Sequence, residues 1–233
     1  MDIWKFYDIT HTDHVICNPS NPEKFARLVD RVRLPEGAKV LEVACGKGEL
    51  LALLAEKYSP AAVGIDASPH CIRDARARLA ARVPGADITL LEMDGAHYRP
   101  GAAESFDLTV CLGASWIFNG HRGTLEALRA WTRPNGQIAV GEPYWRQDPD
   151  PEYLRRTGFA PDMFATHYQN VVAGQELGLE LLYTLDSSHD DWDVYEGLRW
   201  TAGENYALVH PEDPDVPELL SRIRREKQDY LHY

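Results

Sequence analysis

Short apolar runs alternate with amphipathic patterns from Lys39 onward. The strand-like runs are KVLEVAC (39–45), AAVGIDA (61–67), ITLLEMD (88–94), FDLTVCLGAS (106–115) and QIAVGEP (137–143). The helix-like stretches between them are ELLALLAEKY (49–58), PHCIRDARARLAARV (69–83) and TLEALRAWTR (124–133). Because the runs are largely apolar, they are typical of parallel strands that helices cover on both faces. This order predicts an α/β fold with a Rossmann-like, doubly wound, mostly parallel sheet.

The segments on either side of this core are mainly helical in pattern. We expect one domain over 1–233, made of an N-terminal lid and helix (1–34), a core (35–145) and a cap (146–233). In the lid, a loop should precede a helix that starts near Asn21 and Pro22, a typical cap and first-turn pair. In the cap, the pattern predicts helices over 161–177, 191–209 and 216–233, and one further strand, LELLYTLDSS, over 179–188.

The composition excludes several classes of function. Lys and Arg number 24 and Asp and Glu 36, which gives a formal net charge of −12 and disfavours nucleic acid or anionic membrane as a partner. No apolar run approaches the roughly 20 residues that span a bilayer, and the N-terminus has no signal-peptide pattern. We therefore expect a cytoplasmic protein. The four cysteines, and the group His11, Asp13, His14 and Cys17, match no compact metal spacing, so we expect no metal site.

The turn after the first apolar run indicates a ligand. Gly46 and Gly48 lie between a strand and a helix, where backbone N–H groups face nucleotide-like ligands. A dinucleotide fingerprint would need a third glycine where Leu51 stands, and a phosphate loop would need a closing G-K-[ST] that is absent. Glu42, near the end of the strand, would repel a pyrophosphate and attract an ammonium group. The turn therefore predicts a nucleoside that carries an amino acid.

Two further acids stand at strand ends. Asp66 ends the second run in GIDAS, close to the offset of roughly 20 residues at which an acid meets ribose hydroxyls. Asp94 ends the third run in EMDGA, where a carboxylate beside a backbone N–H can read an adenine edge. A single strand-end Asp is often only a helix cap. Acids on three consecutive strands favour one shared ligand site.

Five stretches carry a resemblance to a known family: LEVACGKGEL, GIDAS, EMDGAHY, FDLTVCLGASW and RPNGQIAVGEPYW. From about Pro19 to Trp145 the chain resembles the class I S-adenosylmethionine-dependent methyltransferases, specifically the small-molecule branch of compact bacterial enzymes. GEPYW and the later DDWDVYEGLRW look like a largely uncharacterised subgroup and extend the likeness towards the C-terminus.

The resemblance implies S-adenosyl-L-methionine as the cofactor, bound across the carboxyl edge of a seven-stranded sheet. It implies that Glu42 and the glycine loop hold the methionine part, Asp66 the ribose, and Asp94 with its neighbours the adenine. The implied cofactor-binding residues are Glu42, Ala44, Gly46, Gly48, Asp66, Ala67, Ser68, Asp94, Gly95, Ala96, Leu112 and Gly113.

The chain departs from the family in two places. Ala44 stands where the family usually has its first glycine, and we expect the backbone there to keep a negative φ, which alanine tolerates. Such enzymes usually close with an antiparallel hairpin strand, and none follows Tyr233, so we expect a truncated C-terminus.

The implied reaction is an in-line displacement at a sulfonium methyl group, in which alignment supplies much of the rate. Glu142, at a strand end facing the donor, is the first candidate catalytic residue, to orient the acceptor or take its proton, and His14 in the lid is the second. The alternatives are a cap or an ion pair with Arg146 for Glu142, and a hydrogen-bonded structural role for His14. The residues expected to wall the acceptor pocket, unless they are core rings, are Tyr7, Trp116, Tyr144 and Trp145.

Three more aromatic residues, Trp192, Tyr195 and Trp200, recur at helical spacing, and we interpret them as the buried stripe of a cap helix.

The sequence thus predicts a cytoplasmic methyltransferase that acts on a small molecule, as a monomer or homodimer. Two alternatives stay open. One is a protein that binds the methyl donor or S-adenosylhomocysteine without turnover. The other is an NAD-dependent oxidoreductase, against which Glu42 and the missing third glycine count.

Overall fold

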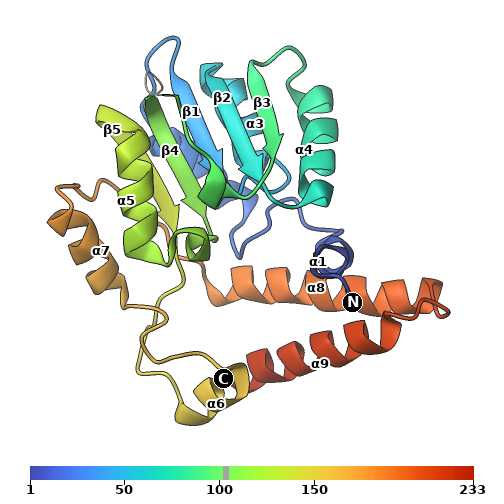
Figure 1. Ribbon diagram of the computed structural model, residues 1–233. Helices are drawn as coiled ribbons and strands as arrows, with labels where there is room; N and C mark the ends of the chain where they lie inside the picture. The colour runs from blue at the N-terminus through green and yellow to red at the C-terminus, as the bar shows by residue number, and fades with distance from the viewer. Residues whose placement is uncertain (102–104) are drawn as a thin grey trace.

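A computed structural model describes residues 1–101 and 105–233. In these residues five strands form one parallel sheet in the order β3-β2-β1-β4-β5. The strands are β1 (Lys39–Val43), β2 (Ala61–Asp66), β3 (Ile88–Glu92), β4 (Phe106–Leu112) and β5 (Thr132–Gly141). Their carboxyl ends share one edge, the lower edge of the sheet in Figure 1. Strand order reverses at β1, which pairs with β2 on one side and β4 on the other, so this edge carries the switch point at which open α/β sheets bind ligands.

Helices flank this sheet, which confirms the predicted Rossmann-like α/β fold. On one side, α3 (Glu49–Tyr58) contacts α2 (Pro22–Arg31) and α4 (Pro69–Arg82). On the other, α5 (His121–Trp131) packs on β4 and β5 and contacts α7 (His167–Glu176). The apolar side chains of β1 and α3 are buried together in the main core because both elements carry apolar residues on the faces that meet.

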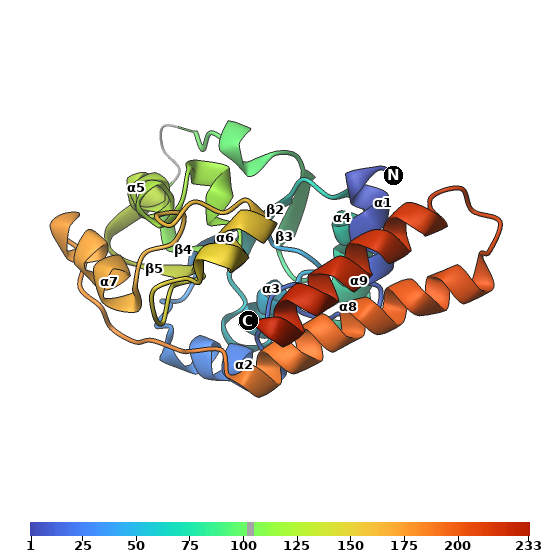
Figure 2. The ribbon, with the colours of Figure 1, turned by 90° about the horizontal axis from the view of Figure 1, so that it is seen from below.

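The remaining helices lie beyond the carboxyl edge. They are α1 (Ile3–Thr10), α6 (Pro151–Thr157), α8 (His189–Val209) and α9 (Val216–His232). In Figures 1 and 2, α8 and α9 form an antiparallel pair below the sheet, with α1 close to α8. Phe6 and Ile9 of α1 are buried against Leu219 and Ile223 of α9, so a small apolar core joins the N-terminal helix to the last one.

The structure confirms the helices expected near Asn21 and over 191–209 and 216–233, and it corrects the lid. Residues 3–10 form helix α1, where the sequence predicted a loop. The side chain of Asp2 accepts hydrogen bonds from the backbone N–H groups of Trp4 and Lys5, a cap that stabilises the start of this short helix.

The cap also differs from the prediction. In the part of the chain that the structure describes, 179–188 forms no strand, so the sheet has five strands there rather than seven. The helix expected over 161–177 begins only at His167, because Thr166 and Gln169 form a capping box at that point. An additional helix, α6, begins after Asp150, whose carboxylate caps it.

The expectation of a negative φ at Ala44 is wrong. Ala44 has φ +56°, in the left-handed region, because it opens the tight turn that continues through Gly46 (φ +52°) and Gly48 (φ +75°). This conformation costs an alanine roughly 1 kcal/mol that a glycine would not lose.

Among the helices of residues 1–101 and 105–233, none combines the length and the apolar character that crossing a membrane requires.

The positive φ at Ala44 predicts that Ala44→Gly raises the free energy of unfolding by up to about 1 kcal/mol. The matched control is Ala77→Gly at an exposed position inside α4, which should lower it by roughly 0.5–1 kcal/mol. Urea unfolding of the three proteins measures both changes. If Ala44→Gly lowered the free energy of unfolding as much as Ala77→Gly does, this result would contradict a left-handed conformation at Ala44.

Candidate functional site

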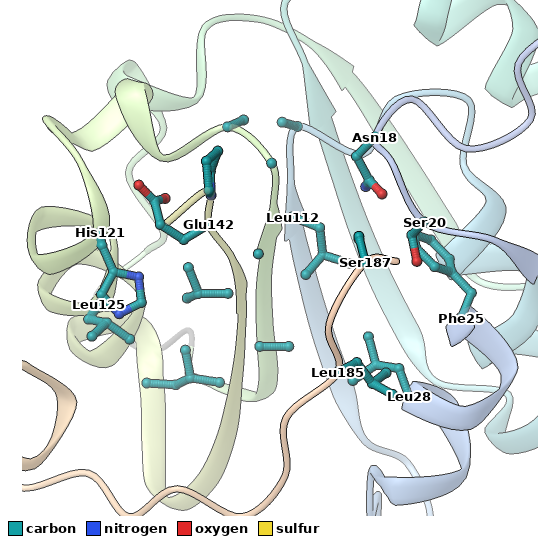
Figure 3. A pocket seen from close by; sticks show the side chains of 18 of the residues that line it. Asn18, Ser20, Phe25, Leu28, Leu112, His121, Leu125, Glu142, Leu185 and Ser187 are labelled. Carbon is teal, nitrogen blue, oxygen red and sulfur yellow. The ribbon is translucent and has the colours of Figure 1, made fainter. Parts of the chain in front are cut away.

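A cavity of about 1950 Å³ opens at the carboxyl edge of the sheet and runs along β5. Its wall combines the glycine loop, Asp66, the N-terminal segment, the end of β5 and one face of α8. Figure 3 shows Glu142, His121 and Leu125 on one side of the cavity and Asn18, Ser20 and Phe25 on the other. A space of this size exceeds what a single drug-sized ligand needs.

The Asp66 carboxylate organises the glycine loop. One of its oxygens accepts a hydrogen bond from the backbone N–H of Gly46 at 2.8 Å, and the other accepts from that of Ser68, also at 2.8 Å. The carboxylate therefore ties the turn after β1 to the turn after β2. Burial raises the pKa of Asp66, while these two N–H groups favour its ionised form.

Glu42 is a buried carboxylate with an unused acceptor. Its side chain is 4% exposed, and Oε2 has no hydrogen-bond partner among the described residues. It faces a second, small cavity of about 40 Å³, which Asn18 and Gly46 also line. Burial, with a smaller contribution from the nearby Asp66, raises the pKa of Glu42 well above its usual value. A cationic group at this point would supply the missing partner.

Asp94 lies farther out on the same edge. Its side chain is about half exposed, accepts a hydrogen bond from the Ala96 N–H at 2.9 Å and pairs with His97 at 3.2 Å. The next residue, Gly95, packs against β1 so closely that an added Cβ would lie 2.5 Å from Val43. The short helix η1 (Gly95–His97) is therefore fixed against the sheet beside the cavity.

Glu142, at the end of β5, lies on the opposite side of the cavity from the lid (Figure 3). Burial raises its pKa, and a hydrogen bond from the Ser115 hydroxyl partly opposes that rise. Its Oε2 is buried and, within the described ranges, lacks a hydrogen-bond partner. The predicted alternative, an ion pair with Arg146, does not form, since Arg146 lies 3.8 Å from Asp186.

The aromatic residues predicted for the acceptor pocket divide into two groups. Tyr7, Trp116 and Tyr144 line the cavity, and Trp116 is 72% exposed there. The Tyr144 hydroxyl donates to Asp186 at 2.8 Å. Trp145 lies outside the described cavity wall, because its ring packs edge-on against Tyr153 and Phe164 and its Nε1 donates to the carbonyl of Pro161.

The other predicted residues divide in the same way. The cofactor-binding candidates on the wall of the large cavity are Ala44, Gly46, Asp66, Ser68, Leu112 and Gly113. Those that lie outside its described wall are Glu42, Gly48, Ala67, Asp94, Gly95 and Ala96. His14 is also absent from that wall. It is 4% exposed, and its Nε2 donates to the backbone carbonyl of Tyr195 at 2.9 Å.

Sequence reasoning missed several residues of the wall. Lys47, in the glycine loop, is buried, and its ammonium donates to the carbonyls of His11 (2.8 Å) and Thr12 (3.2 Å). It also lies 3.3 Å from Asp74. The loop and the lid are thereby joined. A lysine between the two glycines was the available signal, since a cation there needs anionic or carbonyl partners.

The aromatic residues predicted as the buried stripe of α8 contact two different parts of the protein. Trp192 and Tyr195 line the cavity, whereas Trp200 packs against Tyr230 of α9 with ring centroids 5.6 Å apart. The stripe was visible in the sequence, but the surface that each ring meets depends on where α9 and the lid lie.

The comparisons with known proteins agree with this geometry. The family model described as "Methyltransferase domain" matches residues 40–136. A SAM-dependent methyltransferase from Thiobacillus denitrificans, crystallised with S-adenosyl-L-homocysteine, is 30% identical, with a TM-score of 0.89 over 99% of this chain and 93% of that one. Its counterpart from Geobacter sulfurreducens, also with S-adenosyl-L-homocysteine, is 29% identical, with a TM-score of 0.91 over 100% and 93%. A trans-aconitate 2-methyltransferase of Paracidovorax citrulli is 31% identical over 72% of this chain and 65% of its own length.

The buried Glu42 carboxylate predicts an effect on stability. Because its pKa is raised on folding, the native state holds this proton more tightly than the unfolded chain, and stability falls as pH rises from the unfolded towards the folded pKa. Glu42→Gln removes the ionisation and should stabilise the ligand-free protein at pH 8 by about 1–3 kcal/mol.

Urea unfolding at pH 5 and pH 8 measures this effect, with the exposed Glu36→Gln as the control. An equal stability of the Glu42→Gln variant and the natural protein at pH 8 would show that the Glu42 carboxylate already has a partner.

Proposed function

The chain belongs to the S-adenosylmethionine-dependent methyltransferases, and from this premise we propose that it transfers the methyl group of S-adenosylmethionine to a small-molecule acceptor by in-line displacement. The observation that carries the proposal is that the large cavity is continuous from the glycine loop and Asp66 to a second group of polar and aromatic side chains around Glu142. One cavity can thus hold a donor and an acceptor side by side.

The residues present fit the cofactor. The unpartnered Oε2 of Glu42 would meet the ammonium of the methionine part, and Asp66 retains lone pairs for the ribose hydroxyls beyond its two backbone bonds. Asp94 and the backbone of η1 would lie towards the adenine. When bound, S-adenosylmethionine supplies a methyl group on a cationic sulfur that an acceptor lone pair can attack from behind.

The protein's part in the reaction is to position the acceptor and exclude water. Tyr7, Trp116 and Tyr144 would enclose an acceptor between the lid and the end of β5. Reactants that are aligned in this way react as if one of them were present at an effective concentration of ~10⁵ to 10⁸ M. Glu142, when ionised, would accept a hydrogen bond from the acceptor and so orient it or take its proton.

The second candidate, His14, fits a structural role better. Since its Nε2 carries the proton that it donates to the Tyr195 carbonyl, and since it lies outside the described cavity wall, it would hold α8 against the lid. This is the alternative that the sequence had left open for a single histidine.

Asp66→Ala is expected to weaken the binding of S-adenosylhomocysteine by about 1–3 kcal/mol, because ribose hydroxyls and the Gly46 N–H both lose an acceptor. Calorimetric titration measures the change, with the exposed Asp87→Ala as the matched control. Unchanged affinity in Asp66→Ala would remove Asp66 from the binding site.

Glu142→Gln should slow turnover by about 100-fold while the affinity for S-adenosylhomocysteine stays within about threefold. Turnover is followed as transfer of labelled methyl groups from S-adenosylmethionine into a small-molecule extract. Because burial raises the pKa of Glu142, activity should fall with decreasing pH at a higher pH than an ordinary glutamate would give. In the Glu142→Gln variant, activity should not show this fall at low pH.

The exposed Glu152→Gln on α6 serves as the control and should leave turnover and its pH profile unchanged. Normal turnover in Glu142→Gln would return Glu142 to a structural role.

A further inference from the structure

A hydrogen bond between the lid and α8 closes one side of the cavity. The Tyr195 hydroxyl lies 2.9 Å from Nε2 of His11, and both residues line the cavity wall. His11 ends α1 as its C-cap, and Tyr195 lies in α8, so the bond joins the two helices that cross below the carboxyl edge in Figure 1. Beside it, Lys47 of the glycine loop donates to the His11 carbonyl, which places the pair next to the cofactor loop.

The neighbours of His11 decide which of its nitrogens carries the proton. The Thr10 hydroxyl donates its single hydrogen to the carbonyl of Phe6 at 2.9 Å, so it acts as an acceptor towards Nδ1 of His11, 3.0 Å away. The backbone carbonyl of Tyr7, 3.2 Å from the same nitrogen, can only accept. Both contacts require a proton on Nδ1.

The direction of the whole chain of hydrogen bonds follows. With its proton on Nδ1, a neutral His11 presents a bare lone pair at Nε2, and the Tyr195 hydroxyl must donate to it. The hydroxyl then has no hydrogen left for the cavity and offers only lone pairs there. A ligand that meets Tyr195 must therefore bring a hydrogen of its own.

The surroundings keep both groups in these states. Burial, together with the positive charges that His14, Arg199 and Lys47 would place nearby, lowers the pKa of His11 to about 3, so the imidazole is neutral at physiological pH. Burial also raises the pKa of Tyr195, which stays protonated. Arg199 lies over the Tyr195 ring with its guanidinium carbon 5.9 Å from the ring centroid, and it pairs with Glu196 at 2.8 Å.

We propose that Tyr195 binds the acceptor by accepting a hydrogen bond from it, and that the acceptor is a hydroxyl, amine or thiol compound rather than a carboxylate. This inference rests on the proposed methyl transfer. As the acceptor's lone pair forms the new bond to the methyl carbon, the carbon–sulfur bond breaks and its electron pair stays on sulfur. The acceptor's hydrogen points at the Tyr195 oxygen during this step, and its proton leaves to solvent with the methylated product, so Tyr195 and His11 keep their own protons.

The neutral state of His11 suits this role. Burial and the nearby Arg199 and Lys47 oppose a charge on the imidazole, so Nε2 keeps its lone pair and the Tyr195 hydroxyl keeps donating to it. A carboxylate acceptor has no proton to give and would meet only the lone pairs of Tyr195. His11 acts through Tyr195 and is a positioning residue, while Glu142 orients the acceptor from the opposite wall.

The first test reads the hydrogen bonds without any acceptor. Nitrogen-15 spectra of the histidine side chains are recorded at pH 7 with saturating S-adenosylhomocysteine. The chain has nine histidines, so the His11 signals are assigned by their absence in His11→Asn. We expect a neutral ring with its proton on Nδ1, and a shift of Nε2 alone in Tyr195→Phe. A proton on Nε2, or a doubly protonated ring, would overturn the proposal.

The second test reads the class of acceptor. The enzyme is incubated with methyl-labelled S-adenosylmethionine and the small-molecule fraction of a bacterial extract, and the products are treated with mild alkali. Methyl esters of carboxylates release volatile methanol, whereas methyl ethers, amines and thioethers keep their label. We expect alkali-stable products, and about 100-fold less of them with Tyr195→Phe, because the acceptor loses the hydrogen bond that aligns it. The control is Tyr206→Phe, on the same helix as Tyr195, which loses a hydrogen bond to Asp213 in the turn after α8 and should match the natural protein.

The outcomes separate the two proposals. Alkali-labile products, or turnover in Tyr195→Phe within about threefold of the natural protein, would overturn the role of Tyr195 and leave methyl transfer intact. Absence of any labelled product with normal S-adenosylhomocysteine binding would overturn methyl transfer itself, and the nitrogen spectra would still decide the direction of the hydrogen bonds.

Discussion

The site depends on one carboxylate that braces two turns. Asp66 accepts from the backbone of Gly46 on one side and of Ser68 on the other, and so it fixes the loop after β1 relative to the start of α4. The strained backbone at Ala44 is tolerable only in a loop held this firmly. Because a turn with positive φ at Ala44, Gly46 and Gly48 has few internal hydrogen bonds, an external acceptor is what gives it a single shape.

The sequence predicted those features whose signals are local. Apolar runs located the five strands of the described residues, and helix α3 has the predicted bounds, because each element buries a continuous apolar face. The acids at the ends of β1, β2 and β3 could be placed on one edge because parallel strands end together. The prediction of a negative φ at Ala44 was wrong because the tight turn requires a left-handed conformation at this position. The turn geometry was decided by its glycines and by Asp66, and alanine has to follow it.

Features that depend on tertiary packing could not be predicted. Trp145 belongs to the same motif as Tyr144, yet it turns into an aromatic cluster with Tyr153 and Phe164. Tyr195 was visible only as part of a buried stripe. The contact of Tyr195 with His11 depends on the helix at residues 3–10, which places His11 beside α8. The Asp2 carboxylate helps to form that helix by accepting hydrogen bonds from two backbone N–H groups. The segment 179–188 has a strand-like composition, but a strand also needs a neighbour in register, and its own sequence cannot supply one.

Lys47 gives the molecule a kinetic property. Its ammonium donates to the carbonyls of His11 and Thr12 from within the glycine loop, so the lid is held by the same loop that we propose to bind the donor. In this arrangement, the hydrogen bonds from Lys47 to the lid would have to break before the donor could enter or leave the cavity. We therefore expect compulsory order, with the donor first on and its demethylated product last off, and a turnover number set by lid opening instead of by bond making.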